Sequence, residues 1–531
     1  MKTPKYILSA ILGMTLAVSG MALHASAAQQ LVGYFGDVTL DGAVSVVDIV
    51  KLQKNLLAID KLDSELAVTL ADMNADGKVN AFDLAILKRS ILKDDLRGMY
   101  VEVPDPTEPP TEPPTEPPTE PPTEPPTDAP MIPAVAHNIY SSLPSQGKGN
   151  LVIFYVDFPD CRYTVDLPTE LIEEIAFGEE DTSDRNYPFD SISAFYKRSS
   201  KGVMDLNGKV FRYTTKENRS AYDEDKEKLA RECYNAFKDS EDFRNFDGNA
   251  DGVIDATLFT VPTAAGDDYW WPQAGGFFDF SYSVDGMSIG HIITGNAQIE
   301  SKTEYKNFVS SYLHELGHCM GIPDYYLYYS DDYEGFHGNA GTEMMDADAY
   351  TDFGCFSKLM LGWYREDQVA VYDAAQGSQT FLLNNAQTSE GNCVIIPYGK
   401  LDDRYFSEYF IIEYITPDGN NSGLHRDMWW QEVGSGVRVF HVQAEISTDY
   451  WWTFFRYENG SEFTNYDDGG HRLIRLVNDG KGVFKTGSVI NSSTPGFGWY
   501  DWNGGETVNP GVSISVGELV NGQYSITISP Q

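Results

Sequence analysis

The sequence is poor in basic residues and in cysteine, and both shortages exclude whole classes of protein. Lysine and arginine together number 38 against 79 aspartates and glutamates, which gives a formal net charge of -41. Such an acidic chain is a poor partner for nucleic acids and anionic surfaces, and it is well suited to binding calcium. The five cysteines, Cys161, Cys233, Cys319, Cys355 and Cys393, are scattered and odd in number, so they predict no disulfide framework. We expect buried free thiols, and a single Cys319–Cys355 bridge is the alternative.

Long apolar stretches are also missing, except at the N-terminus. Lys2 and Lys5 precede a largely apolar run that ends in Ala25-Ser26-Ala27. This order is typical of a secretory signal, residues 1–27, with an A-x-A cleavage site, and a membrane anchor is the alternative. Because no later stretch is long and apolar enough to span a bilayer, we expect a secreted, extracellular protein without a membrane span.

Two repeats, residues 36–57 and 71–92, have the spacing of calcium loops. They contain D-V-T-L-D-G-A-V-S-V-V-D and D-M-N-A-D-G-K-V-N-A-F-D, and each runs into an expected helix, residues 49–57 and 84–92. Oxygen-bearing side chains at positions one, three, five, nine and twelve, with glycine at six, suit seven-coordinate calcium. The expected ligands are Asp37, Thr39, Asp41, Ser45 and Asp48, then Asp72, Asn74, Asp76, Asn80 and Asp83, with the carbonyls of Ala43 and Lys78 at position seven.

Aspartate rather than glutamate at position twelve separates these loops from an EF-hand sensor. Paired loop–helix units of this kind resemble the dockerin module, over about residues 31–98. The resemblance implies a small all-α, calcium-binding domain that docks onto a cohesin of a scaffoldin in a cellulosome-like assembly. A calcium-stabilised spacer is the alternative interpretation.

Residues 101–130 are dominated by a repeat of T-E-P-P. Frequent proline prevents helix and sheet formation and favours an extended polyproline II conformation. At about 3.1 Å per residue this linker could span on the order of 75 Å. We interpret it as a tether.

A short motif, H-E-x-x-H at residues 314–318, predicts a zinc site in the domain that we place at residues 147–368. With only nine histidines in the chain, a chance match has a probability of roughly one in a hundred. Residues four apart share one face of a helix, so His314 and His318 would present two imidazoles to one point. Catalytic zinc takes three protein ligands and leaves a position for water. Glu315 is then the expected general base.

The third ligand is expected just beyond this helix. Gly321 and Pro323 end the helix and turn the chain back, which would bring Asp324 to the metal. The pattern H-E-x-x-H-x-x-G-x-x-D matches the metzincin arrangement with aspartate as third ligand. Glu334 and Glu343 are the alternative third ligands, although Gly321 would then have no role.

A methionine in a tight turn downstream of the third ligand would match the metzincin Met-turn. The segment G-T-E-M-M-D, residues 341–346, offers two methionines. Met345 is slightly favoured over Met344, and a methionine that simply fills core space is the alternative.

Elsewhere in this domain the pattern predicts strands at 151–158 and 256–261 and helices at 191–199, 223–237 and 353–363. The segment N-F-D-G-N-A-D-G-V-I-D resembles half an EF-loop. Its expected calcium ligands are Asp247, Asn249, Asp251, the carbonyl of Val253, and Asp255. A solvated turn is the alternative.

Taken in order, several of these segments resemble the immune inhibitor A family of secreted bacterial metallopeptidases, over about residues 150–442. The marks are D-G-N-A-D-G-V-I-D, the pair Trp271-Pro272, H-E-L-G-H-C-M-G-I-P-D, the methionine turn, S-K-L-M-L-G-W, E-Y-F-I-I-E-Y and S-G-V-R-V-F-H-V. The resemblance implies a zinc endopeptidase in which His314, His318 and Asp324 bind zinc and Glu315 is the base.

Residues 369–531 read as short β-rich runs, for example 409–414, 436–442, 473–477 and 524–528, which favour a β-sandwich packed on the catalytic domain. Trp429, Trp430, Trp451 and Trp452 could bind carbohydrate, although core packing is favoured. Tyr325 and Tyr350 are oxyanion-stabilising candidates by position only, ahead of Lys358 and Arg365.

The sequence thus predicts an α+β protein with a metzincin-like α/β catalytic domain. Its expected function is that of a secreted zinc endopeptidase that acts on protein or peptide substrates and is docked through calcium-loaded repeats to a cohesin. The alternative is a glycan-directed accessory or adhesion protein with an inactive peptidase-like domain.

Overall fold

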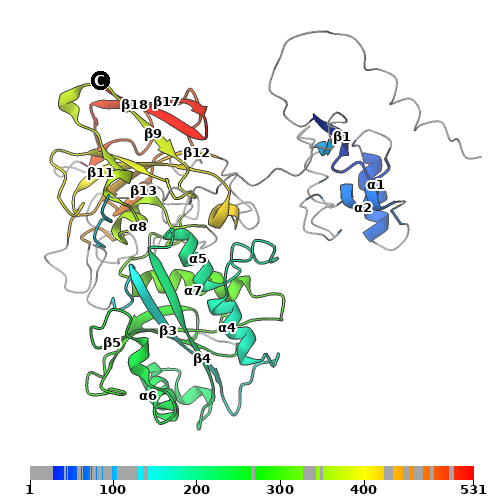
Figure 1. Cartoon of the computed structure of the whole chain (residues 1–531), viewed down its shortest axis with the longest axis vertical. Helices are drawn as coiled ribbons and strands as arrows, with labels where there is room; N and C mark the ends of the chain where they lie inside the picture. Colours follow the sequence, from blue (N-terminus) through cyan, green and yellow to red (C-terminus); the bar gives the residue numbers. More distant parts are fainter. Residues whose placement is uncertain are drawn as a thin grey trace, which may run out of the picture. The chain divides into compact units, whose positions relative to one another are not determined.

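The fold is mixed α and β and divides into two compact units, Met1–Thr123 and Glu124–Gln531, seen in a computed structural model (Figure 1). The structure describes residues 28–40, 44, 46–56, 61–62, 64–71, 73, 79, 87, 98–103, 129–134, 141–264, 269–326, 343–346, 351–423, 435–446, 455–458, 471–478, 483–500 and 507–531. Within these ranges, no helix has both the length and the apolar character needed to cross a membrane.

The N-terminal unit contains two described helices, α1 (Val46–Leu56) and α2 (Glu65–Ala71), and an antiparallel ribbon of β1 (Ala28–Tyr34) and β2 (Gly98–Val103). Its core includes Val38, Leu52, Ala71, Met73 and Leu87. Helix α1 confirms the helix expected after the first loop. The all-α expectation is not confirmed, because the ribbon pairs the two ends of this unit. Those ends are 64 or more residues apart in sequence, so no local pattern joins them.

The first sheet of the C-terminal unit has the order β4-β3-β5-β7-β6. Four of its strands are parallel, namely β3 (Gly147–Asp157), β4 (Met204–Thr214), β5 (Val253–Thr260) and β7 (Ser288–Gly295). The edge strand β6 (Gln273–Gly276) runs antiparallel to β7. The expected strands at 151–158 and 256–261 are therefore confirmed as β3 and β5, each of which ends one residue earlier than expected.

Helices cover both faces of this sheet. The side chains of Leu151 and Ile153 pack with α4 (Thr169–Phe177), α5 (Ile192–Ser199) and α7 (Lys306–Cys319), whereas Val152 and Phe154 pack with α6 (Lys226–Phe237). Because both faces are buried, β3 is a nearly continuous apolar run rather than an alternating one. Helices α5 and α6 confirm the helices expected at 191–199 and 223–237.

In the described part of the chain, two larger sheets and the two-stranded sheet of β15 and β16 lie beyond the helix α8 (Cys355–Met360). The five-stranded sheet has the order β13-β12-β11-β10-β8 and the four-stranded sheet the order β14-β17-β18-β9. Their strands are β8 (Val369–Val371), β9 (Gln379–Asn384), β10 (Cys393–Pro397), β11 (Glu408–Ile415), β12 (Gly436–Gln443), β13 (Ile474–Leu476), β14 (Val489–Ile490), β17 (Val512–Val520) and β18 (Gln523–Pro530). Short elements complete the chain: β15 (Trp499–Tyr500), β16 (Thr507–Val508), η1 (Arg219–Ala221), η2 (Phe243–Phe246), η3 (Glu366–Gln368), η4 (Ala374–Gln376) and η5 (Gly419–Gly423).

Strand β11 shows how the five-stranded sheet joins the rest of the unit. Phe410 and Ile412 face the core shared with the four-stranded sheet, whereas Tyr409 and Ile411 join the large core that also contains α7 and α8. Alternate residues of one strand thus serve two cores. The β-rich segment is therefore part of the same compact body as the first sheet.

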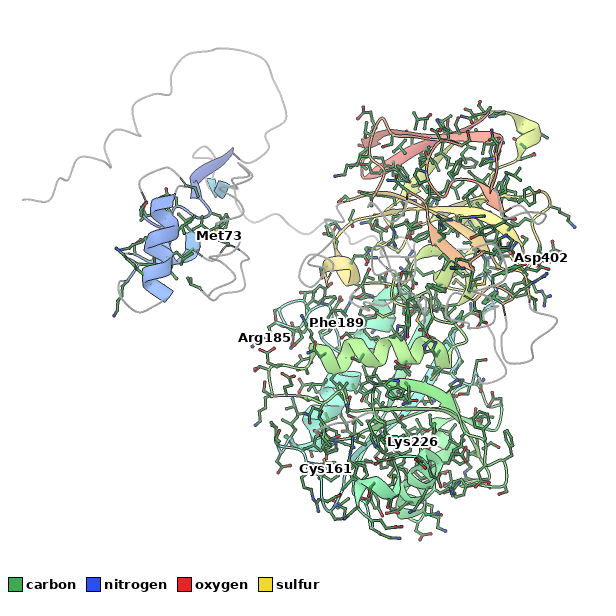
Figure 2. The ribbon with its side chains drawn as sticks, turned by 180° about the vertical axis from the view of Figure 1, so that it is seen from behind. Met73, Cys161, Arg185, Phe189, Lys226 and Asp402 are labelled. Carbon is green, nitrogen blue, oxygen red and sulfur yellow. The ribbon has the colours of Figure 1, made fainter. Side chains whose placement is uncertain are left out.

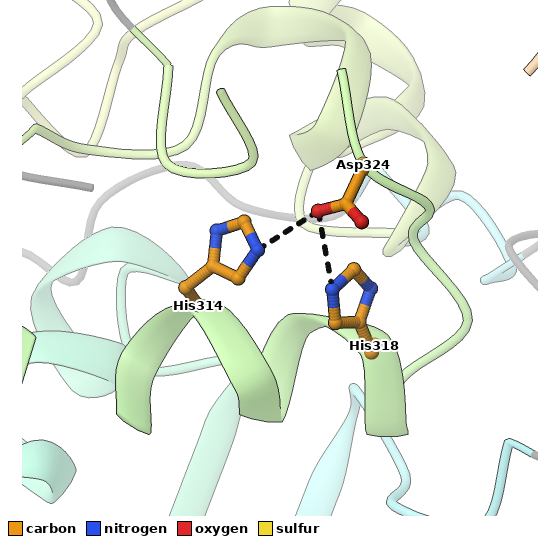
Figure 3. Close-up of side chains that lie close together, drawn as sticks. All are labelled: His314, His318 and Asp324. Atoms are coloured by element: carbon orange, nitrogen blue, oxygen red, sulfur yellow. Dashed lines mark hydrogen bonds and ion pairs between the residues drawn. The ribbon is translucent and has the colours of Figure 1, made fainter. Parts of the chain in front are cut away.

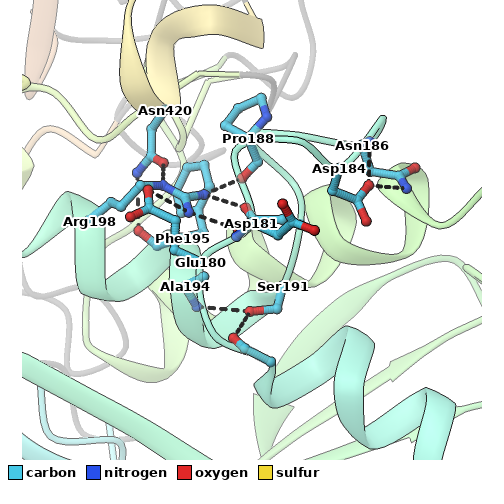
Figure 4. Close-up of polar contacts among 12 residues, drawn as sticks. Glu180, Asp181, Asp184, Asn186, Pro188, Ser191, Ala194, Phe195, Arg198 and Asn420 are labelled. Atoms are coloured by element: carbon cyan, nitrogen blue, oxygen red, sulfur yellow. Dashed lines mark hydrogen bonds and ion pairs between the residues drawn. The ribbon is translucent and has the colours of Figure 1, made fainter.

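Arg198, near the end of α5, ties the first sheet's helices to η5 (Figure 4). Its guanidinium donates to both carboxylate oxygens of Asp190, at 2.6 and 3.0 Å, and to Asn420 Oδ1 at 2.8 Å. Ser191 caps the start of α5, because its Oγ accepts the Ala194 N–H at 2.9 Å. Segments that are more than 200 residues apart in sequence are thus held by partly buried polar contacts.

All five cysteines are free thiols, and four of them are buried. This confirms the expectation of unpaired thiols, and the alternative Cys319–Cys355 bridge is not formed. Burial raises the pKa of the Cys233, Cys319 and Cys355 thiols well above the usual value, so they stay protonated and unreactive. Cys161, labelled in Figure 2, is the half-buried one, whereas Met73 and Phe189, labelled in the same view, are buried.

Candidate metal centre

Helix α7 ends as its sequence predicts. Gly321 adopts a left-handed conformation, with φ of 95°, and its N–H donates to the His318 carbonyl at 2.9 Å. The Ile322 N–H donates to the Gly317 carbonyl at 3.1 Å, which completes a Schellman-type cap. Glycine is needed here because a side chain at this φ would be strained. The cap turns the chain back over the helix and brings Asp324 above the two histidines.

Backbone carbonyls orient the two imidazoles. His314 Nδ1 donates to the Met344 carbonyl at 2.9 Å, and His318 Nδ1 donates to the Ile322 carbonyl at 2.8 Å. A carbonyl can only accept, so these contacts place a proton on each Nδ1, and Nε2, which faces Asp324, is the nitrogen that would bind a metal. Figure 3 shows both Nε2 atoms directed at Asp324. Such carbonyl contacts are the usual support of metal-binding histidines.

The three donor atoms lie close together. His314 Nε2 and His318 Nε2 lie 2.9 and 3.3 Å from Asp324 Oδ1. Two ligands of tetrahedral zinc, each about 2.0–2.2 Å from the metal, lie roughly 3.4 Å apart. Within the described part of the chain, these residues form the one group of three or more His, Cys, Asp or Glu whose ligand atoms lie within 4.8 Å of one another. Imidazole nitrogen and carboxylate oxygen are both zinc ligands in proteins, so the chemistry of these three residues fits a zinc ion.

The alternative ligand Glu343 is engaged elsewhere. Its carboxylate accepts hydrogen bonds from the Met345 N–H, the Gly354 N–H and the Ser357 hydroxyl, and it is not in the group of three. The other alternative, Glu334, lies outside the described residues. Asp324 is therefore the third donor that the geometry favours.

The histidines and Asp324 shift one another's pKa values. Burial alone would lower the pKa of His318, but the Asp324 carboxylate outweighs it and raises this pKa to about 9. Burial would likewise raise the pKa of Asp324, whereas the two histidines hold it far below the usual value. Without a metal, the ionised carboxylate therefore faces protonated imidazole, and a bound cation would take the place of that proton.

Glu315, the expected base, lies buried beside the ligands. Burial raises the pKa of its carboxyl, and the charges of His314 and His318 oppose this rise. The backbone N–H of Ala274, in the edge strand β6, donates to the Glu315 carboxyl. The acid–base candidate therefore lies against the edge of the first sheet, a placement that the sequence did not reveal.

The turn Glu343–Asp346 packs against α7. The carbonyl of Met344 accepts the His314 contact described above. A Cβ at Gly317 would lie 2.5 Å from Met345 Sδ, so the thioether packs against the helix between the two histidines. The turn therefore contacts α7 through the backbone of Met344 and the side chain of Met345, and its identity as a Met-turn stays a prediction.

The predicted oxyanion candidates lie away from the donor group or outside the described residues. The hydroxyl of Tyr325 contacts Ser357 Oγ at 2.9 Å, and Lys358 donates to Asp352 Oδ2 at 2.5 Å. Arg365 pairs with Asp367 and Glu390. Tyr350 lies outside the described residues, as do Trp429, Trp430, Trp451 and Trp452.

Tyr326 is the phenol that the sequence analysis missed. Its ring stacks on His314 with centroids 6.2 Å apart, and its side chain hydrogen-bonds Asp324. Its place two residues after the third ligand was the only available signal.

The loop at 247–255 is compact, but its carboxylates do not meet the three-ligand criterion above. Asp247 accepts the N–H groups of Asp251 and Gly252, at 3.0 and 2.9 Å, and Val253 N–H donates to Asp251. Asp255 is fully buried and accepts the N–H groups of Gly248 and Asn150. Burial raises the pKa of Asp255 to about 7, helped by the charges of Asp247 and Asp251. A calcium ion at Asp247, Asn249, Asp251, Val253 and Asp255 stays a prediction.

The first loop of the N-terminal unit is described in part. Asp37 and Asp48 are buried, and the backbone N–H and hydroxyl of Thr39 donate to Asp48 Oδ1, at 3.0 and 2.8 Å. Positions three and twelve of the loop thus lie together, as calcium binding requires. The remaining predicted ligands, Asp41, Ala43, Ser45, Asp72, Asn74, Asp76, Lys78, Asn80 and Asp83, lie outside the described residues.

Comparison with known families assigns this unit. A family model described as the dockerin type I domain matches residues 35–92. The chain carries a dockerin. Dockerin domains bind calcium and imply a cohesin partner and an extracellular, cellulosome-associated setting. A search of curated proteins found no match to the chain.

Proposed function

We propose that the chain is a zinc-dependent endopeptidase that its dockerin attaches to a cohesin-bearing scaffold outside the cell. The observation that carries the proposal is the convergence of His314 Nε2, His318 Nε2 and Asp324 Oδ1 on one point, with Glu315 buried beside them. Both imidazoles are already oriented by backbone carbonyls, so the donors need no large rearrangement to bind a metal.

The chemistry of peptide hydrolysis divides between the ion and the carboxylate. A zinc ion held by these three residues supplies Lewis acidity, which polarises a carbonyl group and lowers the pKa of water. Glu315 takes the proton of the attacking water and returns it to the leaving amine. Because burial raises its pKa, the protonated form is less costly than for an exposed glutamate, which favours the return step.

The edge strand β6 supports a peptide as the substrate. In its sheet β6 pairs with β7 on one side, and β6 packs against α7. The other edge of such a strand offers backbone N–H and C=O groups to an extended chain, which can add to the sheet as a further strand. A peptide bound along β6 would pass close to Glu315, since the Ala274 N–H already contacts its carboxyl.

The test compares Glu315→Ala with wild type in hydrolysis of casein, with calcium present throughout. Glu315→Ala should keep zinc and lose cleavage by about 10²- to 10⁴-fold, the usual worth of a general base. Glu300→Ala, which removes an exposed glutamate, is the matched control and should cleave like wild type. Cleavage by Glu315→Ala at the wild-type rate would contradict the proposal, as would cleavage that persists after zinc is removed by a chelator.

A further inference from the structure

The turn formed by residues 343–346 supports the proposed zinc site through its backbone as well as through a methionine side chain. The Asp346 N–H donates to the Glu343 carbonyl at 2.9 Å, which closes the turn. The Met344 carbonyl accepts from His314 Nδ1, and the Met345 carbonyl accepts the Tyr325 N–H at 2.8 Å. Tyr325 directly follows the ligand Asp324. The turn therefore supports one ligand by a hydrogen bond and the neighbour of another.

The carboxylate of Glu343 helps to hold this turn, together with the Asp352 carbonyl, which accepts the Met344 N–H at 3.3 Å. Glu343 is 1% exposed; its Oε2 accepts the Met345 N–H at 2.5 Å, and its Oε1 accepts the Gly354 N–H at 2.9 Å and the Ser357 hydroxyl at 2.6 Å. Ser357 Oγ in turn contacts the Tyr325 hydroxyl. These contacts form a closed ring that runs from Glu343 through Ser357 and Tyr325 to Met345 and back.

The ring requires a carboxylate rather than an amide. Three groups donate to Glu343, one to Oε2 and two to Oε1. A glutamine has one acceptor oxygen and one NH₂ group, so whichever way it is turned, an NH₂ would face a donor. Burying a carboxylate costs free energy: burial raises the pKa of Glu343 to about 7, and the three donors oppose this rise.

We propose that Glu343 is a positioning residue of the zinc site, which holds the Met344 carbonyl against His314 and the Met345 carbonyl against Tyr325. The proposal rests on the zinc site of the proposed function. Outer partners of metal-binding histidines typically contribute 10- to 100-fold to metal affinity. Glu343 acts one step further out, through the backbone of the turn.

The experiment measures the zinc dissociation constant of the full chain by competition with a chromophoric chelator, in calcium, together with the melting temperature of the zinc-free protein. Glu343→Gln should weaken zinc binding about 10- to 100-fold. Ser357→Ala removes one of the three donors and should weaken it about 2- to 10-fold. Glu408→Gln is the control, because Glu408 is another buried carboxylate, bonded to His441 and to the Tyr500 N–H at 2.8 Å each.

The control separates positioning from stability. Glu408→Gln should lower the melting temperature yet bind zinc within about twofold of wild type, since a distant ΔΔG is independent of the site. If Glu343→Gln lowers the melting temperature equally but binds zinc like wild type, Glu343 is merely structural and the proposal is wrong. If Glu343→Gln does not fold, Ser357→Ala decides: unchanged zinc affinity in that variant overturns the proposal. Absence of zinc binding by wild type would instead refute the proposed function itself.

Discussion

Substitution of Gly317 by alanine would test the packing of Met345 under the helix between the two histidines. The new Cβ would lie 2.5 Å from Met345 Sδ and 3.1 Å from its Cε, with Phe353 at 3.5 Å. Overpacking of a filled core costs about 1–3 kcal/mol. Replacing a helical glycine by alanine returns about 1 kcal/mol. We therefore expect Gly317→Ala to lower the free energy of unfolding of the zinc-free protein by about 0–2 kcal/mol.

Combination with Met345→Ala makes the test specific. Met345→Ala alone leaves a cavity and should cost about 2–5 kcal/mol. In the double variant the methyl group introduced by Gly317→Ala meets no thioether and fills part of that cavity. The two changes should therefore couple by about 1–3 kcal/mol, so that the double variant is more stable than the sum predicts. Urea denaturation measures all four corners of the cycle.

The neighbouring methionine provides the control. Met344 is equally buried, but Met345 supplies the atoms nearest to Gly317. Gly317→Ala with Met344→Ala should be additive within about 0.5 kcal/mol. Additivity of Gly317→Ala with Met345→Ala would refute the packing of Met345 against Gly317. Strong coupling of Gly317→Ala to Met344→Ala would instead show that Met344 is the methionine that packs there.

Three further predictions concern the supporting structure. The pKa of Asp255 is raised to about 7, so the free energy of unfolding of the calcium-free protein should fall as the pH rises from about 4 to 7, by at most about 4 kcal/mol. Urea denaturation at several pH values measures this fall, and Asp255→Asn should reduce it. The same dependence on pH in Asp255→Asn and wild type would contradict the prediction. Ser191→Ala removes the N-cap of α5, which accepts the Ala194 N–H, and should lower the free energy of unfolding by about 1–2 kcal/mol in thermal denaturation. A decrease of less than about 0.3 kcal/mol would show that this cap does not stabilise the helix. Asp48→Ala should weaken calcium binding by the dockerin in calorimetry, because Asp48 lies with Thr39 at the first loop, and unchanged affinity would exclude it as a ligand.

Local sequence was sufficient for much of the centre. The spacing of His314 and His318, the glycine that ends α7 and the position of Asp324 all follow from helix geometry and one turn of the chain, and the structure brings these donors together. Apolar runs likewise predicted β3 and β5. Patterns within about ten residues carry this information, because helix faces and turns are local.

The remaining features depend on contacts between distant segments. Strand β1 pairs with β2 across the whole N-terminal unit, and β6 became recognisable as an edge strand only through its partner β7. In the sequence Glu343 was an alternative zinc ligand, because the residue type alone does not distinguish a glutamate that binds a metal from one that accepts hydrogen bonds in the core. Its donors, Gly354 and Ser357, lie 11 and 14 residues away and follow no recognised motif.

The most direct test of the central claim is zinc analysis of the purified full chain, by metal quantification together with X-ray absorption at the zinc edge. The account predicts about one zinc per chain, bound by nitrogen and oxygen at about 2.0–2.2 Å with no sulfur ligand. The signal should be lost in Asp324→Ala. Well-folded protein that takes up no zinc, or zinc bound by sulfur, would contradict the assignment of His314, His318 and Asp324 as a metal centre.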